Sequence, residues 1–269
     1  MTPLGVLHIP HSSAVLPPDL RLSFPLSDDL LQRELLVMTD WYTDELFALP
    51  ASEAVAIRYP VSRLVLDPER FIDDQREVMA SRGMGVIYTR LADGRPLRDA
   101  PTQDERRALI ARFYEPHHEA LTVAVKSALA QHGRCLVVDC HSFPSQPLLC
   151  DLDQAPDRPD ICIGTDPFHT PSWLIQLGAD RFAAAGLSVG IDRPYSGALV
   201  PAECYGRQRS VCAIMIEINR RLYMHEGSGD THETFPEVAG IIQGVLRKLL
   251  KECQSRCAAQ QGAAPDGPR

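Results

Sequence analysis

The stretch Cys135–Ser142 has the sequence C-L-V-V-D-C-H-S and decides how the rest of the chain is interpreted. Four apolar residues in a row, two of them β-branched, are typical of a strand that is buried on both faces. Polar residues follow directly, and ligands of open α/β sheets bind at the carboxyl ends of strands, so we expect His141 to lie at a functional site. We expect Asp139 to orient a ligand histidine. Cys140 points to the opposite side of the strand and is expected to serve packing.

The chain has 269 residues, of which 45% are hydrophobic and 23% charged, and its formal net charge is -8. This acidic balance argues against a nucleic-acid partner, which would need basic patches. We expect neither a membrane span nor a signal peptide, because no sufficiently long apolar run is present. The eight cysteines form no C-x-x-C pair. Free thiols in a reducing cytoplasm are therefore expected. The amino-acid sequence does not predict an oligomeric state.

Strand and helix patterns alternate, which predicts an α/β three-layer sandwich with a central, mostly parallel or mixed sheet. Short apolar runs predict strands over 4–9, 54–59, 63–66, 85–89, 135–138, 161–164, 187–191 and 211–218. Caps and helical spacing predict helices over 28–47, 102–131, 171–185 and 235–253, the second with a kink or break at Pro116. No linker forces a boundary, so residues 1–253 are expected to form a single domain, followed by a disordered tail over 254–269.

Three predicted strand ends carry side chains suited to metal-assisted hydrolysis. His11 follows the first strand, His141 follows the strand 135–138, and Glu217 interrupts the apolar run A-I-M-I-E-I-N. A carboxylate inside such a strand is costly to bury without a partner, which favours a functional role for Glu217. Two histidines and a carboxylate are common ligands of catalytic zinc. We therefore expect His11 and His141 to bind zinc or another divalent metal ion, and Glu217 to act as the general base.

The acidic metal ligand is less well defined by the sequence. Position 14 is alanine, so no H-x-x-E motif follows His11. The candidates are Asp40 or Asp44, which are predicted to lie one turn apart on one face of the first helix. Alternatively, both aspartates are solvent-exposed charges on the surface of the helix.

A second group of residues is assigned to substrate binding. Two arginines flank a predicted strand end with an aspartate between them, and arginine holds carboxylates through two parallel hydrogen bonds. A later strand-end loop offers an arginine and a tyrosine that could close over a ligand. The residues assigned to the substrate are Arg63, Asp67, Arg70, Arg193, Tyr195 and Asn219.

With these residues assembled, the chain resembles the N-formylglutamate amidohydrolase (N-formylglutamate deformylase) family. The motifs stand in family order over nearly the whole chain; they are H-I-P-H-S-S at 8–13, T-D-W-Y-T-D-E-L at 39–46, S-R-L-V-L-D-P-E-R at 62–70, D-C-H-S at 139–142, D-I-C-I-G-T at 160–165, R-P-Y-S-G at 193–197 and E-I-N-R-R-L-Y-M at 217–224. The resemblance implies a zinc carboxypeptidase-like (phosphorylase/hydrolase-like) fold and hydrolysis of a formamide bond, which releases formate and glutamate.

The resemblance also implies roles for single residues. His11 and His141 match the metal-type histidines of the family, Glu217 matches the base, and Arg70 matches the arginine of the D-L-N-R-type motif. This chain departs from the motif because Glu69 replaces the asparagine. An acidic side chain beside the carboxylate-binding arginine is expected to weaken recognition of glutamate.

We therefore expect a metal-dependent amidohydrolase that cleaves the acyl group from a small-molecule N-acyl amino acid, with N-formyl-L-glutamate as a candidate. One alternative is a zinc carboxypeptidase-like or cell-wall amidase activity on a peptide, which an open groove would favour. The other is a non-catalytic small-molecule-binding module on the same fold, which would have no use for a base at Glu217.

Overall fold

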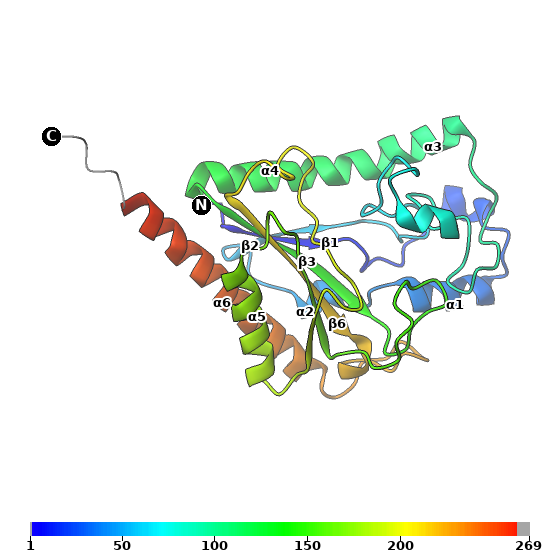
Figure 1. Ribbon diagram of the computed structural model, residues 1–269. Coiled ribbons are helices and arrows are strands. Elements are labelled where there is room, and N and C mark those ends of the chain that lie inside the picture. The colour runs from blue at the N-terminus through cyan, green and yellow to red at the C-terminus, as the bar shows by residue number, and fades with distance from the viewer. Residues whose placement is uncertain (1, 263–269) are drawn as a thin grey trace.

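A six-stranded mixed sheet organises the protein in the computed structural model, which describes residues 2–262 (Figure 1). The strands are β1 (Gly5–Ile9), β2 (Ala54–Arg58), β3 (Cys135–Phe143), β4 (Ile161–Gly164), β5 (Val189–Ile191) and β6 (Val211–Asn219). They lie in the order β2-β1-β3-β6-β4-β5, with β4 antiparallel to β6 and all other neighbours parallel. The predicted α/β class with a mixed sheet is therefore confirmed.

Helices cover both faces of the sheet and complete the three layers (Figure 1). On one face, α4 (Glu115–His132) packs its buried side chains against Val137 of β3 and its neighbours. On the other face, α5 (Ser172–Ala184) and α6 (Phe235–Gly262) pack against a second apolar core, which includes Cys140 as predicted. Among the helices of residues 2–262, none is long and apolar enough to cross a bilayer.

Alternation along the central strands separates the core from the site. Val138 and Cys140 belong to the core beneath α6. Their neighbours Asp139 and His141 therefore point to the α4 face of the sheet, because successive strand residues point to opposite faces. Glu217 of β6 is the parallel register partner of His141 and shares that face.

A third apolar cluster lies beyond the carboxyl ends of the central strands. It combines α1 (Asp28–Met38), the irregular segment 59–97, and residues at the end of and just after α3 (Gln103–Leu109). Figure 1 shows α1 and α3 at this end of the molecule, away from both termini. This cluster supplies a wall that faces the strand ends, and the site lies between the two.

Two predicted strands are wrong, because 63–66 and 85–89 consist of turns, bends and irregular backbone and contain no strand. Leu64 and Val65 are fully buried in the third apolar cluster. The guanidinium of Arg98 donates hydrogen bonds of 2.8 Å to both of their carbonyl oxygens. A side chain thus satisfies backbone groups that a neighbouring strand would otherwise have to pair, so an apolar run is buried here without joining the sheet.

The predicted helix 28–47 is interrupted. α1 ends at Met38, and the backbone N–H of Asp40 donates a 2.9 Å hydrogen bond to the carbonyl of His11. Tyr42 then adopts a left-handed conformation, with φ at 63°, before the short α2 (Thr43–Leu46). Asp40 therefore lies in a break between two helices rather than on a continuous helix face.

The other long helices follow the predictions more closely. A capping box formed by Thr102 and Glu105 starts α3, and a π-helical turn, Ile110–Tyr114, leads into α4 just before Pro116. The last helix extends further than predicted, since α6 continues to Gly262. The end of α6 thus overlaps the first part of the predicted tail, 254–262, and the rest of that tail, 263–269, lies outside the described residues.

Candidate active site

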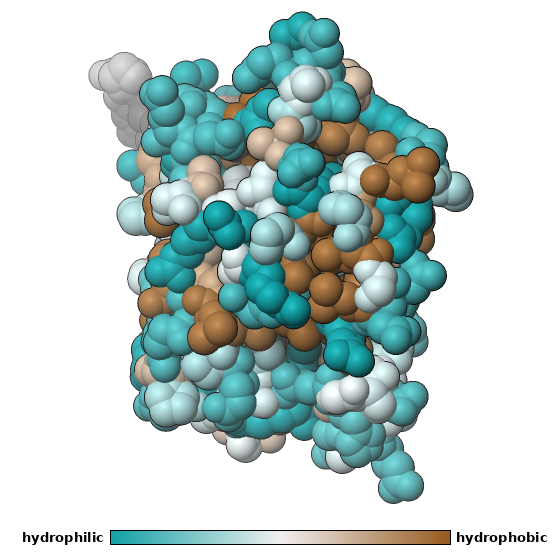
Figure 2. Space-filling view, turned by 90° about the vertical axis from the view of Figure 1, so that its right-hand side faces the viewer, coloured by the Kyte–Doolittle hydropathy of each residue, from teal (hydrophilic) through white to brown (hydrophobic). Residues whose placement is uncertain are grey.

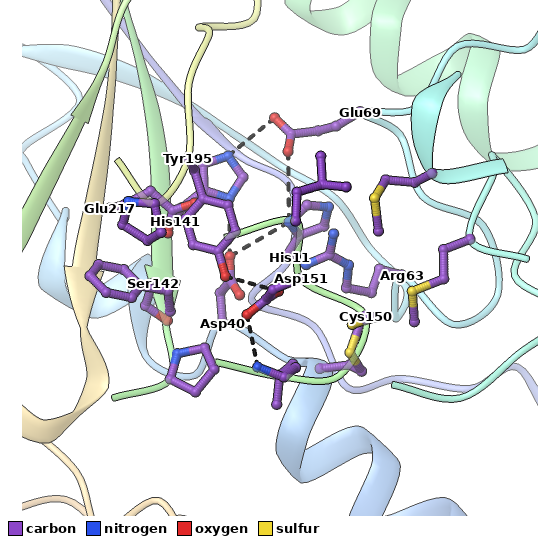
Figure 3. A pocket seen from close by; sticks show the side chains of 18 of the residues that line it. His11, Asp40, Arg63, Glu69, His141, Ser142, Cys150, Asp151, Tyr195 and Glu217 are labelled. Atoms are coloured by element: carbon purple, nitrogen blue, oxygen red, sulfur yellow. Dashed lines mark hydrogen bonds and ion pairs between the residues drawn. The ribbon is translucent and has the colours of Figure 1, made fainter. Parts of the chain in front are cut away.

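Three buried side chains from distant parts of the sequence converge at the carboxyl end of the sheet (Figure 3). His11 follows β1, His141 lies on β3, and Asp40 occupies the break after α1. Oδ2 of Asp40 lies 3.0 Å from Nδ1 of His141 and 3.5 Å from Nδ1 of His11. The two imidazole rings are 5.1 Å apart between centroids. The sheet and the helix break together bring these three ligand-type groups into one cluster.

The far ring nitrogens of both histidines face carboxylates. Nε2 of His11 lies 2.8 Å from Oδ1 of Asp67, and Nε2 of His141 lies 3.2 Å from Oδ1 of Asp139. Metal-binding histidines characteristically donate this second N–H to such an acceptor. When they do so here, both Nδ1 atoms direct lone pairs at the Asp40 carboxylate. Nδ1 of His11 is also buried without a hydrogen-bond partner. Three converging acceptor atoms require a cation between them, so these residues fit a divalent metal ion.

The electrostatics of the cluster agree with this interpretation. Burial and Arg63 oppose protonation of His11, but the charges and hydrogen bonds of Asp67 and Asp40 raise its pKa overall. Burial also disfavours the charged form of His141, yet Glu69 and Asp139 raise its pKa well above the usual value. The carboxylates thus attract positive charge to this point, whether it arrives as protons or as a metal ion.

Two further groups of metal-type ligands overlap the first. One combines His8, Glu69 and Asp139, and the other combines His11, Asp67 and Glu69. The pocket at the strand ends is lined by His11, Asp40 and His141, but not by His8, Asp67 or Asp139. The group His11–Asp40–His141 is therefore the one in which every member faces the space that a ligand can enter.

Glu217 stands beside this group with a free carboxylate oxygen. Its side chain is buried, and Oε2 has no hydrogen-bond partner. Burial raises the pKa of Glu217 to about 8, with the negative charges of Asp40 and Glu69 acting in the same direction. A nearby cation would favour the ionised form. A buried, unpartnered carboxylate next to a metal-type cluster is a suitable proton acceptor.

The sequence did not identify the residue that holds Asp40 in place. Nη2 of Arg220 donates a 3.0 Å hydrogen bond to Oδ1 of Asp40. Nη1 of the same guanidinium donates to the carbonyl of Val37 at 2.6 Å. Arg220 therefore orients the carboxylate so that Oδ2 faces the histidines. Its position directly after the strand that carries Glu217 is the signal that could have identified it.

Asp67 supports the site but does not line it. It is fully buried. Oδ1 accepts from Nε2 of His11 and, at 3.0 Å, from the backbone N–H of Glu69, while Oδ2 accepts from Nη2 of Arg63 at 2.8 Å and from the Tyr88 hydroxyl. Both of its oxygens are thus occupied by protein donors. Asp67 is absent from the pocket lining, which favours a supporting role over the predicted contact with substrate.

The remaining predicted residues divide between the pocket and the surface. Arg63, Arg70 and Tyr195 line the pocket. Arg193 does not, since its half-exposed guanidinium pairs with Asp153 and Asp157 on the outside.

Two further predicted site residues lie outside the pocket lining. Asn219 is buried, and its side chain donates to the carbonyl of Pro159 and accepts from the backbone of Arg221. Asp44 lies 3.9 Å from Arg58 near the surface, outside the cluster. Between the two proposed acidic ligands, only Asp40 belongs to the metal-type group.

The sequence did not predict that Glu69 lies beside the two histidines of the site. One of its carboxylate oxygens lies 3.1 Å from Nε2 of His141, and the other lies 3.8 Å from Nδ1 of His11. Its side chain is 17% exposed and lines the pocket, so it adds negative charge beside the histidines. The sequence showed its departure from the family motif but not that it contacts the site.

The fold and the site together define an α/β protein with a candidate metal centre and an adjacent buried carboxylate at the carboxyl edge of a mixed sheet. The family model for N-formylglutamate amidohydrolase matches residues 4–224. The chain therefore belongs to the N-formylglutamate amidohydrolase family.

Solved structures show the same fold. N-formylglutamate amidohydrolase from Ralstonia eutropha JMP134 matches with a TM-score of 0.83 and 23% identity, over 95% of each chain. A gene product of Agrobacterium tumefaciens matches with a TM-score of 0.65 and 21% identity, over 95% of this chain and 92% of the other. No curated protein sequence matches the chain.

Proposed function

We propose that this protein is a metal-dependent amidohydrolase that removes the acyl group from a small-molecule N-acyl amino acid in the cytoplasm. Family membership supports hydrolysis of an amide, and N-formyl-L-glutamate is the reference substrate that the family name supplies. The observation that carries the proposal is the free carboxylate of Glu217 beside the group His11–Asp40–His141.

Each group has a distinct role in this proposal. His11, Asp40 and His141 hold the metal ion, preferably zinc. A bound zinc ion would supply a water molecule of lowered pKa and polarise the acyl oxygen. Glu217 accepts the proton of the attacking water and returns it to the leaving amine. Asp67 and Asp139 keep the histidines oriented through their Nε2 atoms.

Arginines on the opposite wall fix the leaving amino acid. Arg63 is held in place by Asp67 and by the Tyr88 hydroxyl, which lies 3.1 Å from its Nε. Arg70 lies 3.6 Å from Asp67 through its Nε. Because guanidinium groups bind carboxylates with defined geometry, the α-carboxylate of the substrate is oriented against this pair. The scissile amide is then positioned between the arginines and Glu217.

The size of the pocket favours a small substrate over a peptide. Its volume is about 290 Å³. That is near the lower limit of pockets that enclose a single small molecule. This volume counts against the carboxypeptidase-like or cell-wall amidase alternative, which would need room for several residues.

The test is formate or acid release from a panel of N-formyl, N-acetyl and N-succinyl amino acids, with zinc supplied. We expect Glu217→Gln to lower kcat by about 100-fold to 10,000-fold, the usual contribution of a general base. Metal content and substrate binding should persist in this variant. Glu237→Gln, on the exposed start of α6, is the matched control. Full turnover by Glu217→Gln would refute the role of the base, and binding without turnover by the native protein would support the binding-module alternative.

A further inference from the structure

We propose that the amino acid released by this site carries an apolar side chain, of the size of methionine or leucine, and not the carboxylate side chain of glutamate. This inference rests on the proposed amidohydrolase function and specifies its substrate class. It follows from the composition of the pocket wall around the carboxylate-binding arginines.

Apolar and sulfur-containing side chains form a substantial part of the pocket wall. They include Val37, Met38, Met79, Met84, Leu148 and Leu152. Methionine side chains are flexible and polarisable, so such a wall adapts to apolar groups of differing shape. It offers little to a second carboxylate, which loses hydration on burial and needs a charged or hydrogen-bonding partner in return.

This apolar surface lies on the side of the leaving amino acid. Met84 packs in the same buried cluster as Tyr88, whose hydroxyl contacts Arg63. Cys150 and Arg63 line the same pocket. Figure 3 shows Cys150 and Arg63 on one side, with Glu217 and His141 on the other. Figure 2, which faces this end of the molecule, shows apolar side chains gathered on it. The amino-acid side chain, rather than the acyl group, therefore meets the apolar wall.

The arginine side chains that line the pocket are sufficient to bind one carboxylate of a substrate. Arg220 lines the pocket, but its guanidinium is occupied by Asp40 and by backbone carbonyls. Arg63 and Arg70 remain, and they share the buried Asp67 as a common anion. This pair can hold the α-carboxylate, and no further arginine or lysine lines the pocket among residues 2–262.

The anions of the pocket oppose a second negative charge. Glu69 and Glu217 both line it, and Asp151 does so from the loop that follows β3. The charge of Asp151 is balanced by Arg158 at 2.6 Å, and one of its oxygens accepts from the Tyr195 hydroxyl at 3.2 Å. Glu69 has no arginine partner among the described residues; its ion pairs are with His8, His11 and His141. A glutamate side chain would therefore meet carboxylates in this pocket, and like charges brought together in a site discriminate against a ligand.

The experiment compares kcat/KM for N-formyl-L-methionine, N-formyl-L-leucine, N-formyl-L-glutamine and N-formyl-L-glutamate. A single methylene in an apolar pocket changes kcat/KM by about 10-fold to 200-fold. We expect methionine and leucine derivatives to exceed the glutamate derivative at least about tenfold, with glutamine between them. Equal values, or a preference for N-formyl-L-glutamate, would overturn the inference.

Substitutions at two neighbouring positions test whether the apolar pocket wall determines the preference for the amino-acid side chain. Met79→Lys places a cation in the lining, whereas Val78→Lys alters the neighbouring side chain, which is 66% exposed and does not line the pocket. We expect Met79→Lys to raise the ratio of glutamate to methionine kcat/KM at least about tenfold and Val78→Lys to leave it unchanged. The same ratio in both variants would show that the wall does not select the side chain.

Binding to the Glu217→Gln protein separates this inference from the proposed function. Calorimetric titration with the same four compounds ranks their affinities without turnover. If the native protein hydrolyses none of them, the amidohydrolase proposal fails, yet tighter binding of the methionine derivative still supports the apolar pocket. If none binds, or if the glutamate derivative binds tightest, the inference on substrate class fails.

Discussion

His141 and Glu217 are direct register partners on the adjacent parallel strands β3 and β6. Paired residues on neighbouring strands point to the same face, so the metal-type ligand and the candidate base lie side by side without the help of a loop. All nine residues of each strand are buried. Because the sheet itself holds this pair, its geometry should be among the least mobile in the site.

The first prediction concerns the acidic ligand. Asp40→Asn should weaken binding of zinc by at least about 100-fold, because a ligand loses its charge, and even outer partners of metal sites contribute 10-fold to 100-fold. Asp44→Asn should change metal affinity little, since Asp44 lies outside the cluster. Metal content and competition with a chelator measure both. Loss of zinc in Asp44→Asn, with binding retained in Asp40→Asn, would contradict the assignment.

A second prediction concerns the buried support of His11. Asp67→Asn removes the charge that balances Arg63 and that orients His11. Leaving one partner of a buried ion pair unbalanced typically costs about 3–5 kcal/mol, so the free energy of unfolding in urea should fall by about that amount. Metal affinity should fall by about 10-fold to 100-fold. Asp99→Asn, at an exposed position, is the control. Unchanged stability in Asp67→Asn would mean that another anion balances Arg63.

The third prediction separates two arginines that the sequence assigned to substrate. Arg70 lines the pocket, and Arg193 pairs with aspartates outside it. Arg70→Lys keeps the charge but loses the planar fork, so KM should rise about tenfold with a smaller change in kcat. Arg193→Lys should leave both parameters close to native values. Steady-state kinetics with the N-formyl amino acid that is hydrolysed fastest measures kcat and KM for both variants. A larger increase in KM for Arg193→Lys than for Arg70→Lys would contradict the assignment of Arg70 to substrate binding.

A fourth prediction concerns stability and pH, at a carboxyl group away from the site. Burial raises the pKa of Glu34 from 4.5 to about 7, although its Oε1 accepts a 2.7 Å hydrogen bond from the N–H of Ala92. The folded state therefore holds the proton more tightly than the unfolded state. The resulting stabilisation is present below pH 4.5 and is lost as the pH rises through about 7.

The variant Glu34→Gln imitates the protonated group at every pH. Its free energy of unfolding should match that of the native protein below pH 4.5 and exceed it at pH 8, by up to about 3 kcal/mol for a shift of this size. Thermal unfolding across this range measures the difference. Glu45→Gln, at an exposed position on α2, should show no such trend. A native protein that is more stable at pH 8 than Glu34→Gln would contradict the buried, protonated state.

The strands that form the sheet were predictable because their patterns are local. The runs at 135–138, 161–164 and 211–218 are apolar on both faces, and each became a strand. The run at 63–66 is equally apolar but is buried against the third cluster, where Arg98 satisfies its carbonyl groups. An apolar run indicates that a segment is buried. Whether the segment joins a sheet depends on whether a neighbouring strand or a side chain forms hydrogen bonds with its backbone.

The helix break at Thr39–Tyr42 shows a similar limit. Helical spacing continues through Asp40 and Asp44, but tertiary contacts end α1 at Met38. The hydrogen bond from the Asp40 N–H to the carbonyl of His11 joins this break to the end of β1. Such a contact links residues that are distant in the sequence, so local propensity does not predict it.

The sequence by itself determined the α/β class, the strand ends that carry His11 and His141, and the presence of Glu217 within an apolar strand. The alternation of side chains between the two faces of a strand, and the cost of burying a charge, both act within a single strand. They can therefore be recognised from the sequence alone. Only the tertiary structure placed Asp40 in the metal-type group and Asp44 outside it, brought Arg220 and Glu69 to the cluster, and kept Asp67 out of the pocket lining. These outcomes depend on contacts between segments far apart in the chain, which no local pattern encodes.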